Sequence, residues 1–381
     1  MRHFALNINR EELKLGREIP ALLRLRLKKL FSRERKATGG KILVVDTCIV
    51  GDFFATLPAL RTFIEASGQS VDLLVSPPLK PLAEAIKGVD RVFTAKSVYG
   101  RPMEKGESAE RLSQDYGLVL VLRISGDAFA MLETIKYSSL RIYDIPYFRY
   151  LLHLLKNILL KKEVKQWREI NYEMIGMREP ARRLEFGDIF EFAQEDYDRV
   201  EALPELAGDV RKVMIHTGSG WKIKLWDDKK WAELLRKING LGGFRFIFIG
   251  GGEFERRSLE RIRQDLDFEV YSLIDKTELR ESLLAMRLCD YFIGIDSGPR
   301  NMAHLADLRS ITLLGPAPNN FKPSNGEDIV INKFDCRCKS LCYLHKESAM
   351  QKLDSQEVFE AFKKLSRAPL KAAERPRRRS A

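Results

Sequence analysis

Short apolar runs alternate with helix-like stretches along the first part of the chain. Residues 41–45 form a continuous apolar run, and apolar residues at helical spacing follow from 57 to 64. Further runs lie at 71–75, 91–94 and 118–122. Continuous apolar strands separated by helices are typical of a parallel sheet that is covered on both faces.

A second series of the same kind begins near residue 212. Helical patterns such as 231–238 separate the apolar runs, which lie at 212–216, 244–249, 270–273, 291–295 and 310–314. Two successive series of similar size predict an α/β protein with two Rossmann-like domains, whose parallel sheets face one another across a cleft. The stretch 137–167 breaks the rhythm, and we interpret it as helices and loop.

The length of 381 residues exceeds that of most single domains. We expect the final helix, around residues 356–365, to pack back toward the first domain. The predicted divisions are an N-terminal extension over 1–40, one Rossmann-like domain over 41–183, a second over 184–346, and a C-terminal helix with a tail over 347–381.

The net charge of +12 is concentrated at the two ends of the chain. Residues 1–40 carry 11 Lys/Arg and four Asp/Glu, and residues 363–381 carry eight Lys/Arg and one Asp/Glu. The net charge of the remaining residues is therefore −2. Because the folded part is nearly neutral, nucleic-acid binding is disfavoured. The basic, Leu-containing stretch 10–35 fits either a helix on an anionic membrane surface or a solvated arm.

No apolar stretch approaches the roughly 20 residues that cross a bilayer, and the N-terminus lacks a secretory signal pattern. We therefore expect a cytoplasmic protein, with its basic ends held at the membrane surface. Cys336, Cys338, Cys342 and His345 are four soft ligands within ten residues. Their C-x-C spacing is tighter than in usual zinc sites, so we favour ordinary thiols and expect no metal and no cofactor.

Polar residues follow the first strand of the first domain. Thr47, Gly51 and Asp52 lie where ligands bind in doubly wound sheets, beyond the carboxyl ends of the strands. We expect Gly51 to allow a tight turn and Asp52 to start the next helix, facing the crevice. The alternative for Asp52 is a helix N-cap.

The first strand of the second domain is followed by a comparable loop. It offers small residues for close backbone approach, a hydroxyl and a cation, which suit diphosphate oxygens; these are Thr217, Ser219, Gly220 and Lys224. The alternative is a simple turn.

Polar residues also follow two more strands of the second domain, at the places where the chain leaves each strand; we call these places strand exits. Asp296, Ser297 and Gly298 precede a helical run with Pro299 in its first turn. The backbone amides at the start of such a helix can bind an anion. The alternative is an ordinary capped helix start. Glu253 follows three glycines and could accept from ribose hydroxyls. No G-x-G-x-x-G spacing or Walker loop is present, which disfavours a nicotinamide enzyme.

Three blocks in this order resemble glycosyltransferase family 9, the ADP-heptose:lipopolysaccharide heptosyltransferases. They are ILVVDTCIVGDFFATLPALRTF at 42–63, HTGSGWKIKLWDDKKW at 216–231 and DSGPRNMAHLADLRSITLLGP at 296–316. The resemblance covers about residues 41–365. It implies a GT-B fold, a first domain that binds the acceptor, a second that binds a nucleotide-sugar donor, and inverting, metal-independent transfer to a lipid-linked saccharide.

The resemblance also implies roles for individual residues. Asp52 would be the base and Lys224 would neutralise the departing diphosphate, with Thr47 and Gly51 on the acceptor side. The implied donor-binding set is Thr217, Ser219, Gly220, Lys224, Glu253 for the ribose, Asp296, Ser297, Gly298 and Asn301.

Three positions depart from the family pattern. Asp46 stands at a place that is usually basic, Gly220 where a small hydroxylated residue is frequent, and Asn301 where the family has His. An amide cannot add the positive charge of a protonated imidazole. Transfer of a different nucleotide sugar, or a non-catalytic peripheral protein on the same fold, are therefore the alternatives.

Overall fold

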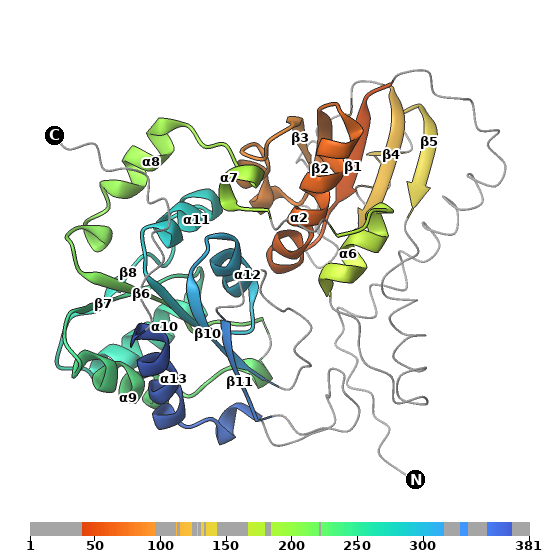
Figure 1. Cartoon of the computed structure of the whole chain (residues 1–381). Coiled ribbons are helices and arrows are strands. Elements are labelled where there is room, and N and C mark those ends of the chain that lie inside the picture. The colour runs from red at the N-terminus through yellow and green to blue at the C-terminus, as the bar shows by residue number, and fades with distance from the viewer. Residues whose placement is uncertain are drawn as a thin grey trace, which may run out of the picture. The chain divides into compact units, whose positions relative to one another are not determined.

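The computed structural model divides into two compact units, Met1–Tyr150 with Asn171–Glu179 and Leu151–Ile170 with Pro180–Ala381 (Figure 1). Each unit is described by itself. The residues that the structure describes are 40–95, 112, 115–123, 128, 131–132, 135–142, 167–179, 184–220, 222–315, 328–333 and 349–367. The basic segment 10–35 and the cysteine cluster lie outside these residues.

The first unit contains a five-stranded parallel sheet with the strand order β3-β2-β1-β4-β5. Its strands are β1 (Ile42–Asp46), β2 (Val71–Val75), β3 (Val89–Thr94), β4 (Tyr116–Arg123) and β5 (Tyr137–Ile142). Strand β5 corrects the interpretation of residues 137–142 as helix and loop. The helices named in this part of the chain are α2 (Val50–Ser67), α3 (Lys80–Ala83) and α6 (Trp167–Ile175).

The second unit contains a six-stranded parallel sheet with the order β11-β10-β9-β6-β7-β8. Its strands are β6 (Arg211–His216), β7 (Phe244–Phe248), β8 (Tyr271–Ser272), β9 (Tyr291–Ile295), β10 (Arg309–Leu314) and β11 (Asp328–Asn332). Its helices are α7 (Phe186–Ile189), α8 (Gln194–Glu201), α9 (Asp228–Asn239), α10 (Glu253–Gln264), α11 (Leu279–Arg287), α12 (Gly298–Leu305) and α13 (Ser355–Arg367). Read from β6, this is the strand order of a Rossmann domain, as sequence analysis predicted.

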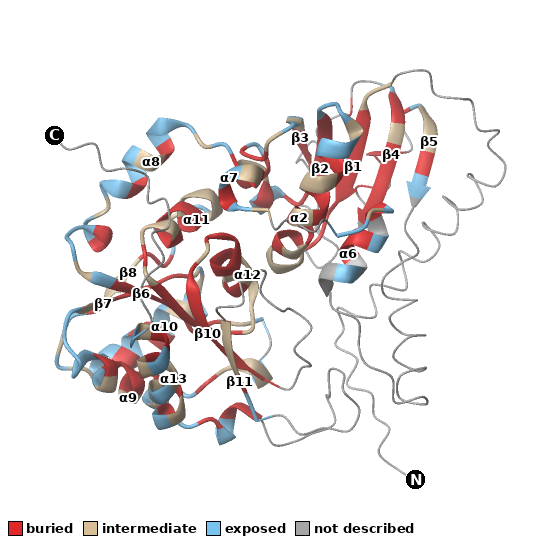
Figure 2. Cartoon of the chain, viewed as in Figure 1, coloured by how far each residue is buried: buried red, intermediate tan, exposed pale blue. Residues whose placement is uncertain are grey.

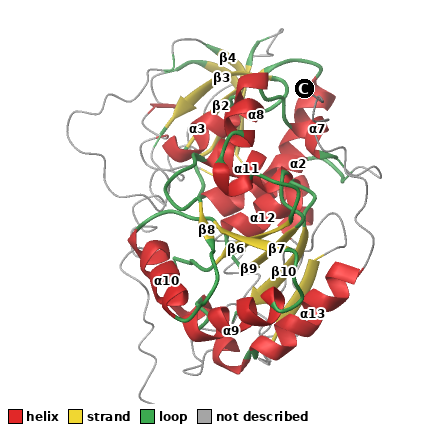
Figure 3. Cartoon of the chain, turned by 90° about the vertical axis from the view of Figure 1, so that its left-hand side faces the viewer, coloured by secondary structure: helices red, strands yellow, loops and turns green. Residues whose placement is uncertain are grey.

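Helices cover both faces of the second sheet. Figure 3 shows α9, α10 and α13 on one side of the strands and α11 and α12 on the other. Figure 2 shows that the central strands of both sheets are buried along most of their length. Burial on both faces explains why these strands were visible in the sequence as continuous apolar runs.

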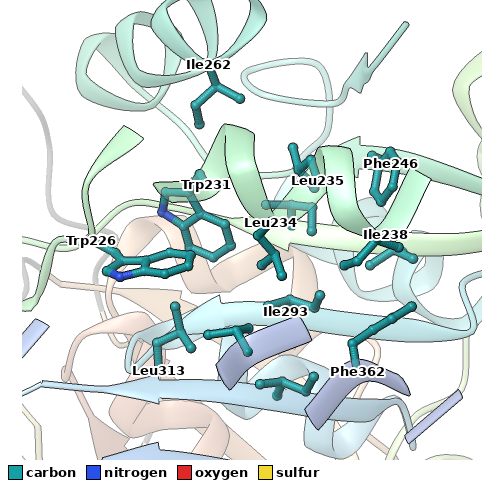
Figure 4. Close-up of a cluster of buried hydrophobic side chains, with 14 of the residues drawn as sticks. Trp226, Trp231, Leu234, Leu235, Ile238, Phe246, Ile262, Ile293, Leu313 and Phe362 are labelled. Atoms are coloured by element: carbon teal, nitrogen blue, oxygen red, sulfur yellow. The ribbon is translucent and has the colours of Figure 1, made fainter. Parts of the chain in front are cut away.

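The main core of the second unit lies between α9 and the sheet (Figure 4). Trp231 is fully buried in α9 and meets Trp226 edge to face, with ring centroids 4.9 Å apart. The indole N–H of Trp226 donates to the carbonyl oxygen of Leu353 over 3.2 Å. This bond ties the chain segment before α13 to the start of α9.

Helix α13 belongs to the same core. Its buried residues Val358, Phe362 and Leu365 join the cluster beneath α9, and Phe362 packs edge to face against Phe244 and Tyr291. The helix contacts α9, β10 and β11. Its apolar face therefore completes the cover of the second sheet, and the expectation that the final helix packs back toward the first domain stays a prediction.

None of the described helices has a stretch long and apolar enough to span a bilayer.

Replacing Phe362 by Ala should lower the free energy of unfolding by about 3–5 kcal/mol, because a fully buried aromatic leaves a cavity in the core. Urea denaturation followed by tryptophan fluorescence measures the loss, since Trp226 and Trp231 lie in the same cluster. Phe254→Ala is the matched control: Phe254 is exposed, and its loss should cost less than about 0.5 kcal/mol. Equal losses for the two variants would contradict the assignment of α13 to this core.

Candidate functional site

The strand orders place a topological switch point in each sheet. In the second unit, β6 lies beside β9, and the chain leaves β6 toward α9 but leaves β9 toward α12, on the opposite face. In doubly wound sheets the crevice at such a point, beyond the carboxyl ends of the strands, binds ligands. The corresponding neighbours in the first unit are β1 and β4.

A hydrogen bond joins the two strand exits of the second unit. The Ser297 hydroxyl lies 3.0 Å from Nδ1 of His216, and it also donates to the Ile295 carbonyl oxygen over 3.1 Å. Ser297 is the N-cap residue of α12, but its side chain makes no capping hydrogen bond. The helix begins at Gly298 with Pro299 in its first turn, as predicted. Its positive end is therefore directed at the switch point.

His216 at the end of β6 is neutral at physiological pH. The ring is buried, and burial lowers the pKa of His216 to about 4. It can therefore orient the Ser297 hydroxyl but adds no charge to the site.

Lys224 supplies the positive charge beside this pair. It ends a short 3₁₀ turn, Lys222–Lys224, and its ammonium lies 2.6 Å from Oδ2 of Asp296. The second Asp296 oxygen accepts from Arg300 over 3.1 Å. Burial alone would raise the pKa of the Asp296 carboxyl, but Lys224 and Arg300 outweigh it and hold that pKa below its usual value. The structure thus brings Lys224 together with Asp296 and Ser297, whereas the sequence only placed Lys224 at one strand exit and the other two residues at another.

The other predicted donor residues differ in exposure. Thr217 is buried, Ser219 is half-buried and Gly220 is exposed, so the loop after β6 rises from the core to the surface. Asn301 lies in the first half of α12 and is half-buried.

Glu255 is a site residue that sequence reasoning missed. A Cβ atom on Gly218 would come within 2.0 Å of its Oε1, and one on Gly250 within 3.0 Å of its Cγ. Burial raises the pKa of the Glu255 carboxyl. Glycines at two neighbouring strand exits therefore make room for this side chain, and they were the available signal.

Glu253, the predicted ribose-binding residue, has a different environment. Its side chain is 59% exposed and pairs with Arg256 and Arg257 on the same helix, α10. Glu255, two residues later, is the carboxylate that lies against the glycines at the ends of β6 and β7.

The acceptor-side residues lie in the first unit, after β1. Thr47 is buried, and α2 begins at Val50 with Ile49 as its N-cap, so Gly51 is helical and does not form the expected tight turn. Asp52 is in the first turn and is half-buried. The N-cap alternative for Asp52 is therefore wrong, because Ile49 occupies that position.

The predicted cysteine cluster, Cys336, Cys338, Cys342 and His345, falls in the stretch between 333 and 349 that the structure does not describe. Among the residues that it does describe, no three His, Cys, Asp or Glu side chains are grouped so that they could hold a metal ion.

The sequence of residues 145–353, more than half of the chain, matches the family model of glycosyltransferase family 9 (heptosyltransferase). The chain belongs to this family. The matched range contains the β6 and β9 exits, so the residues joined at the switch point are part of the family's domain. The assignment agrees with the resemblance that the three sequence blocks predicted.

Individual heptosyltransferases of this family are distant relatives. A lipooligosaccharide heptosyltransferase 2 from Campylobacter jejuni is 25% identical over 151 residues, which are 38% of this chain and 47% of that protein. The chain spans about half the length of the curated relatives that it matches.

Solved structures support the GT-B fold over most of the chain. A glycosyltransferase family 9 protein from Veillonella parvula has a TM-score of 0.66 at 14% identity, covering 88% of this chain and 99% of its own. The E. coli heptosyltransferase WaaC with ADP-2-deoxy-2-fluoro heptose has a TM-score of 0.60 at 17% identity, with coverages of 85% and 99%. The iron-containing glycosyltransferase TibC from enterotoxigenic E. coli, covering 87% of this chain and 78% of its own, has a TM-score of 0.51 at 14% identity.

The buried His216 predicts a specific loss of stability in acid. Below its ordinary pKa the unfolded chain binds a proton, whereas the folded ring stays neutral until about pH 4. The free energy of unfolding should therefore fall as the pH drops from about 6.5 to 4, by roughly 3 kcal/mol from this residue. Urea denaturation at a series of pH values measures the slope.

His216→Gln should reduce that slope, because the amide can still pair with Ser297 but takes up no proton. His304, whose pKa burial also lowers, contributes to the slope that remains. If the variant and the natural protein lost stability in parallel between pH 6.5 and 4, His216 would not be the buried neutral group described.

Proposed function

We propose that this protein is an inverting glycosyltransferase that moves a heptose from ADP-heptose to a lipopolysaccharide core or similar cell-envelope glycan. The observation that carries the proposal is the Lys224–Asp296 pair, 2.6 Å long, beside the Ser297–His216 hydrogen bond at the switch point. This is a fixed cation and a helix start at the place where a Rossmann domain holds diphosphate.

The donor would bind through its diphosphate and its ribose. Lys224 and the first turn of α12 suit the diphosphate oxygens, and Glu255 offers a carboxylate to the ribose hydroxyls at the neighbouring strand exit. Thr217, Ser219, Gly220, Glu253 and Asn301 stay in the proposed donor set. The solved WaaC complex with an ADP-heptose analogue supports the choice of ADP-heptose.

We assign the proton transfer to Asp52. Its carboxylate would take the proton of the acceptor hydroxyl while that oxygen attacks the anomeric carbon, and the bond from that carbon to the diphosphate oxygen would break. Attack from the face opposite the leaving group inverts the anomeric centre. Lys224 would stabilise the negative charge left on the diphosphate, which is why we propose that the transfer needs no metal.

Transfer from ADP-heptose to a truncated lipopolysaccharide acceptor tests the proposal. Asp52→Asn should lower kcat by about 10²–10⁴-fold because the base is lost. Lys224→Met should lower it by about 10²–10³-fold, since the leaving diphosphate keeps its charge unpaired. Lys222→Met is the matched control on the same turn: Lys222 is exposed, and turnover should stay within about twofold.

Three results would count against parts of this proposal. Turnover with a UDP- or GDP-sugar but not with ADP-heptose would favour the alternative of a different nucleotide sugar, to which the Asn301 departure points. Binding of a sugar nucleotide without Asp52-dependent turnover would favour a non-catalytic protein. Loss of activity in EDTA, restored by a metal, would refute metal independence, which the iron-containing TibC makes necessary to test.

We also propose that the basic end segments hold the enzyme at the cytoplasmic face of the membrane, where a lipid-linked acceptor is presented. Each Lys or Arg near an anionic surface contributes about 1 kcal/mol of binding. Neutralising Arg24, Arg26, Lys28 and Lys29 to Gln should weaken co-sedimentation with phosphatidylglycerol-containing vesicles at least about tenfold. Lys229→Gln with Lys352→Gln, on exposed positions of the second unit, should leave it unchanged; equal weakening would contradict the proposal.

A further inference from the structure

Helix α12 carries two ionisable residues on the side that faces the sheet. Arg300 and His304 are one turn apart and both are buried, and the helix packs against β9 and β10. Beneath them lies Asp328, the first residue of β11, with its side chain shut off from solvent. Ser310 and Thr312 of β10 donate to its Oδ1 over 3.0 and 2.8 Å.

The guanidinium of Arg300 bridges two carboxylates. One Nη lies 3.1 Å from Asp296 Oδ1, and the other lies 2.9 Å from Asp328 Oδ2. The planar guanidinium has the fork geometry that such bridging requires. Together with the 2.6 Å contact between Lys224 and Asp296, these bonds link the edge strand β11 to the proposed diphosphate site.

Stability alone is a poor explanation for this arrangement. Taking a guanidinium and two carboxylates out of water is costly, and apolar side chains of similar volume often stabilise a core as well or better. Arg300 is completely buried, so it pays the full desolvation cost. Arg300 contacts Asp296 directly, and Asp296 in turn contacts Lys224. Arg300 can therefore influence the position of Lys224, which is more than packing requires.

We propose that Arg300 is a positioning residue for the donor site: anchored by Asp328, it orients Asp296 and thereby sets the place of the Lys224 ammonium. This inference rests on the proposed function, in which that ammonium meets the diphosphate. Arg300 itself is buried and does not contact the ligand.

The charge balance explains how the effect would be transmitted. Asp296 now shares its negative charge between two cations, Lys224 and Arg300. Without Arg300, Lys224 would be the carboxylate's main partner among these groups, and Asp296 would compete more strongly with phosphate for the ammonium. The freed Oδ1 would also allow the carboxylate to rotate and shift Lys224.

Arg300→Met in the full-length protein tests the inference by calorimetric titration with ADP and, separately, with inorganic pyrophosphate. Affinity for both should fall by about 10–100-fold, as when an outer partner of a functional group is removed. Arg300→Lys should recover only part of the loss, because a single ammonium cannot bridge both carboxylates. Arg280→Met is the matched control: Arg280 pairs with the buried Asp196 between α11 and α8, and its loss should affect stability but leave affinity within about twofold.

A pH profile supplies a second readout that a purely structural role would not move. Among the described residues, the charged and titratable groups around Asp296 are Lys224 from the 3₁₀ turn, Arg300 and His304 from α12, and Asp328 from β11. Arg300 lowers the pKa of Asp296, so its removal should raise that pKa. The acid limb of kcat/KM, or of pyrophosphate affinity, should therefore move to higher pH in Arg300→Met and stay in place in Arg280→Met.

If Arg300→Met does not fold, the pair Arg300→Met with Asp328→Leu removes both charges and leaves no unpaired carboxylate beneath α12. It should fold and show the same loss of affinity. If affinity and the acid limb changed no more in Arg300→Met than in Arg280→Met, the inference would be overturned, but the proposed function would not. Loss of pyrophosphate affinity in Arg300→Met, with no turnover of ADP-heptose by the natural protein, would support the inference and refute the proposed sugar transfer. If the natural protein bound no nucleoside diphosphate, ADP included, and no pyrophosphate, both the inference and the proposed function would be overturned.

Discussion

The proposed donor site depends on one topological constraint, the divergence of the chain at the ends of β6 and β9. These strands are hydrogen-bonded neighbours, but their connections leave toward opposite faces of the sheet. Side chains that follow the two strands can therefore meet at the point where the two connections diverge. The Ser297–His216 hydrogen bond and the Lys224–Asp296 pair both form at this point. If β6 and β9 were separated by another strand, none of these contacts could form.

Charge in this region is paired at every step from the core to the site. Asp328, Arg300, Asp296 and Lys224 alternate in sign, and the pKa of Asp328 is held well below its usual range despite burial. His216 and His304 are kept neutral by burial, so neither adds a positive charge to this region near physiological pH. If the diphosphate binds at Lys224 as proposed, it meets an array of groups that are already paired and hydrogen-bonded, which needs little reorganisation to receive it.

The sequence predicted all the inner strands of the two sheets, together with the edge strands β3 and β8, but it missed the edge strands β5 and β11. Strands β1, β6 and β9 are buried on both faces and are visible as unbroken apolar runs. The missed strands, β5 and β11, lie at sheet edges and mix polar with apolar residues, as in YSSLRI and DIVIN. Because these two strands are only partly covered, neither has a continuous apolar run by which to recognise it.

The site residues divide in the same way. Asp296 and Ser297 could be predicted because they directly follow the apolar run of β9, and Lys224 because it lies in the loop after β6. Glu255 was missed because its direction depends on where α10 begins, and a shift of two helical residues turns a side chain by about 200°. The Arg300–Asp328 contact could not be read at all, since it joins residues that are far apart in sequence and lie on a helix and an edge strand.

Helix α13 sets a limit on how far sequence similarity defines the domain. The family match ends at residue 353, two residues before α13 begins. Yet this helix supplies part of the apolar layer that shields β10 and β11, and the Trp226 indole is anchored to Leu353 at the very boundary. The range matched by the family model is thus shorter than the unit that shares this hydrophobic core. A second unit cut at the end of the similarity would expose to water the part of this apolar layer that α13 covers, so a fragment meant to keep the core intact should extend through residue 367.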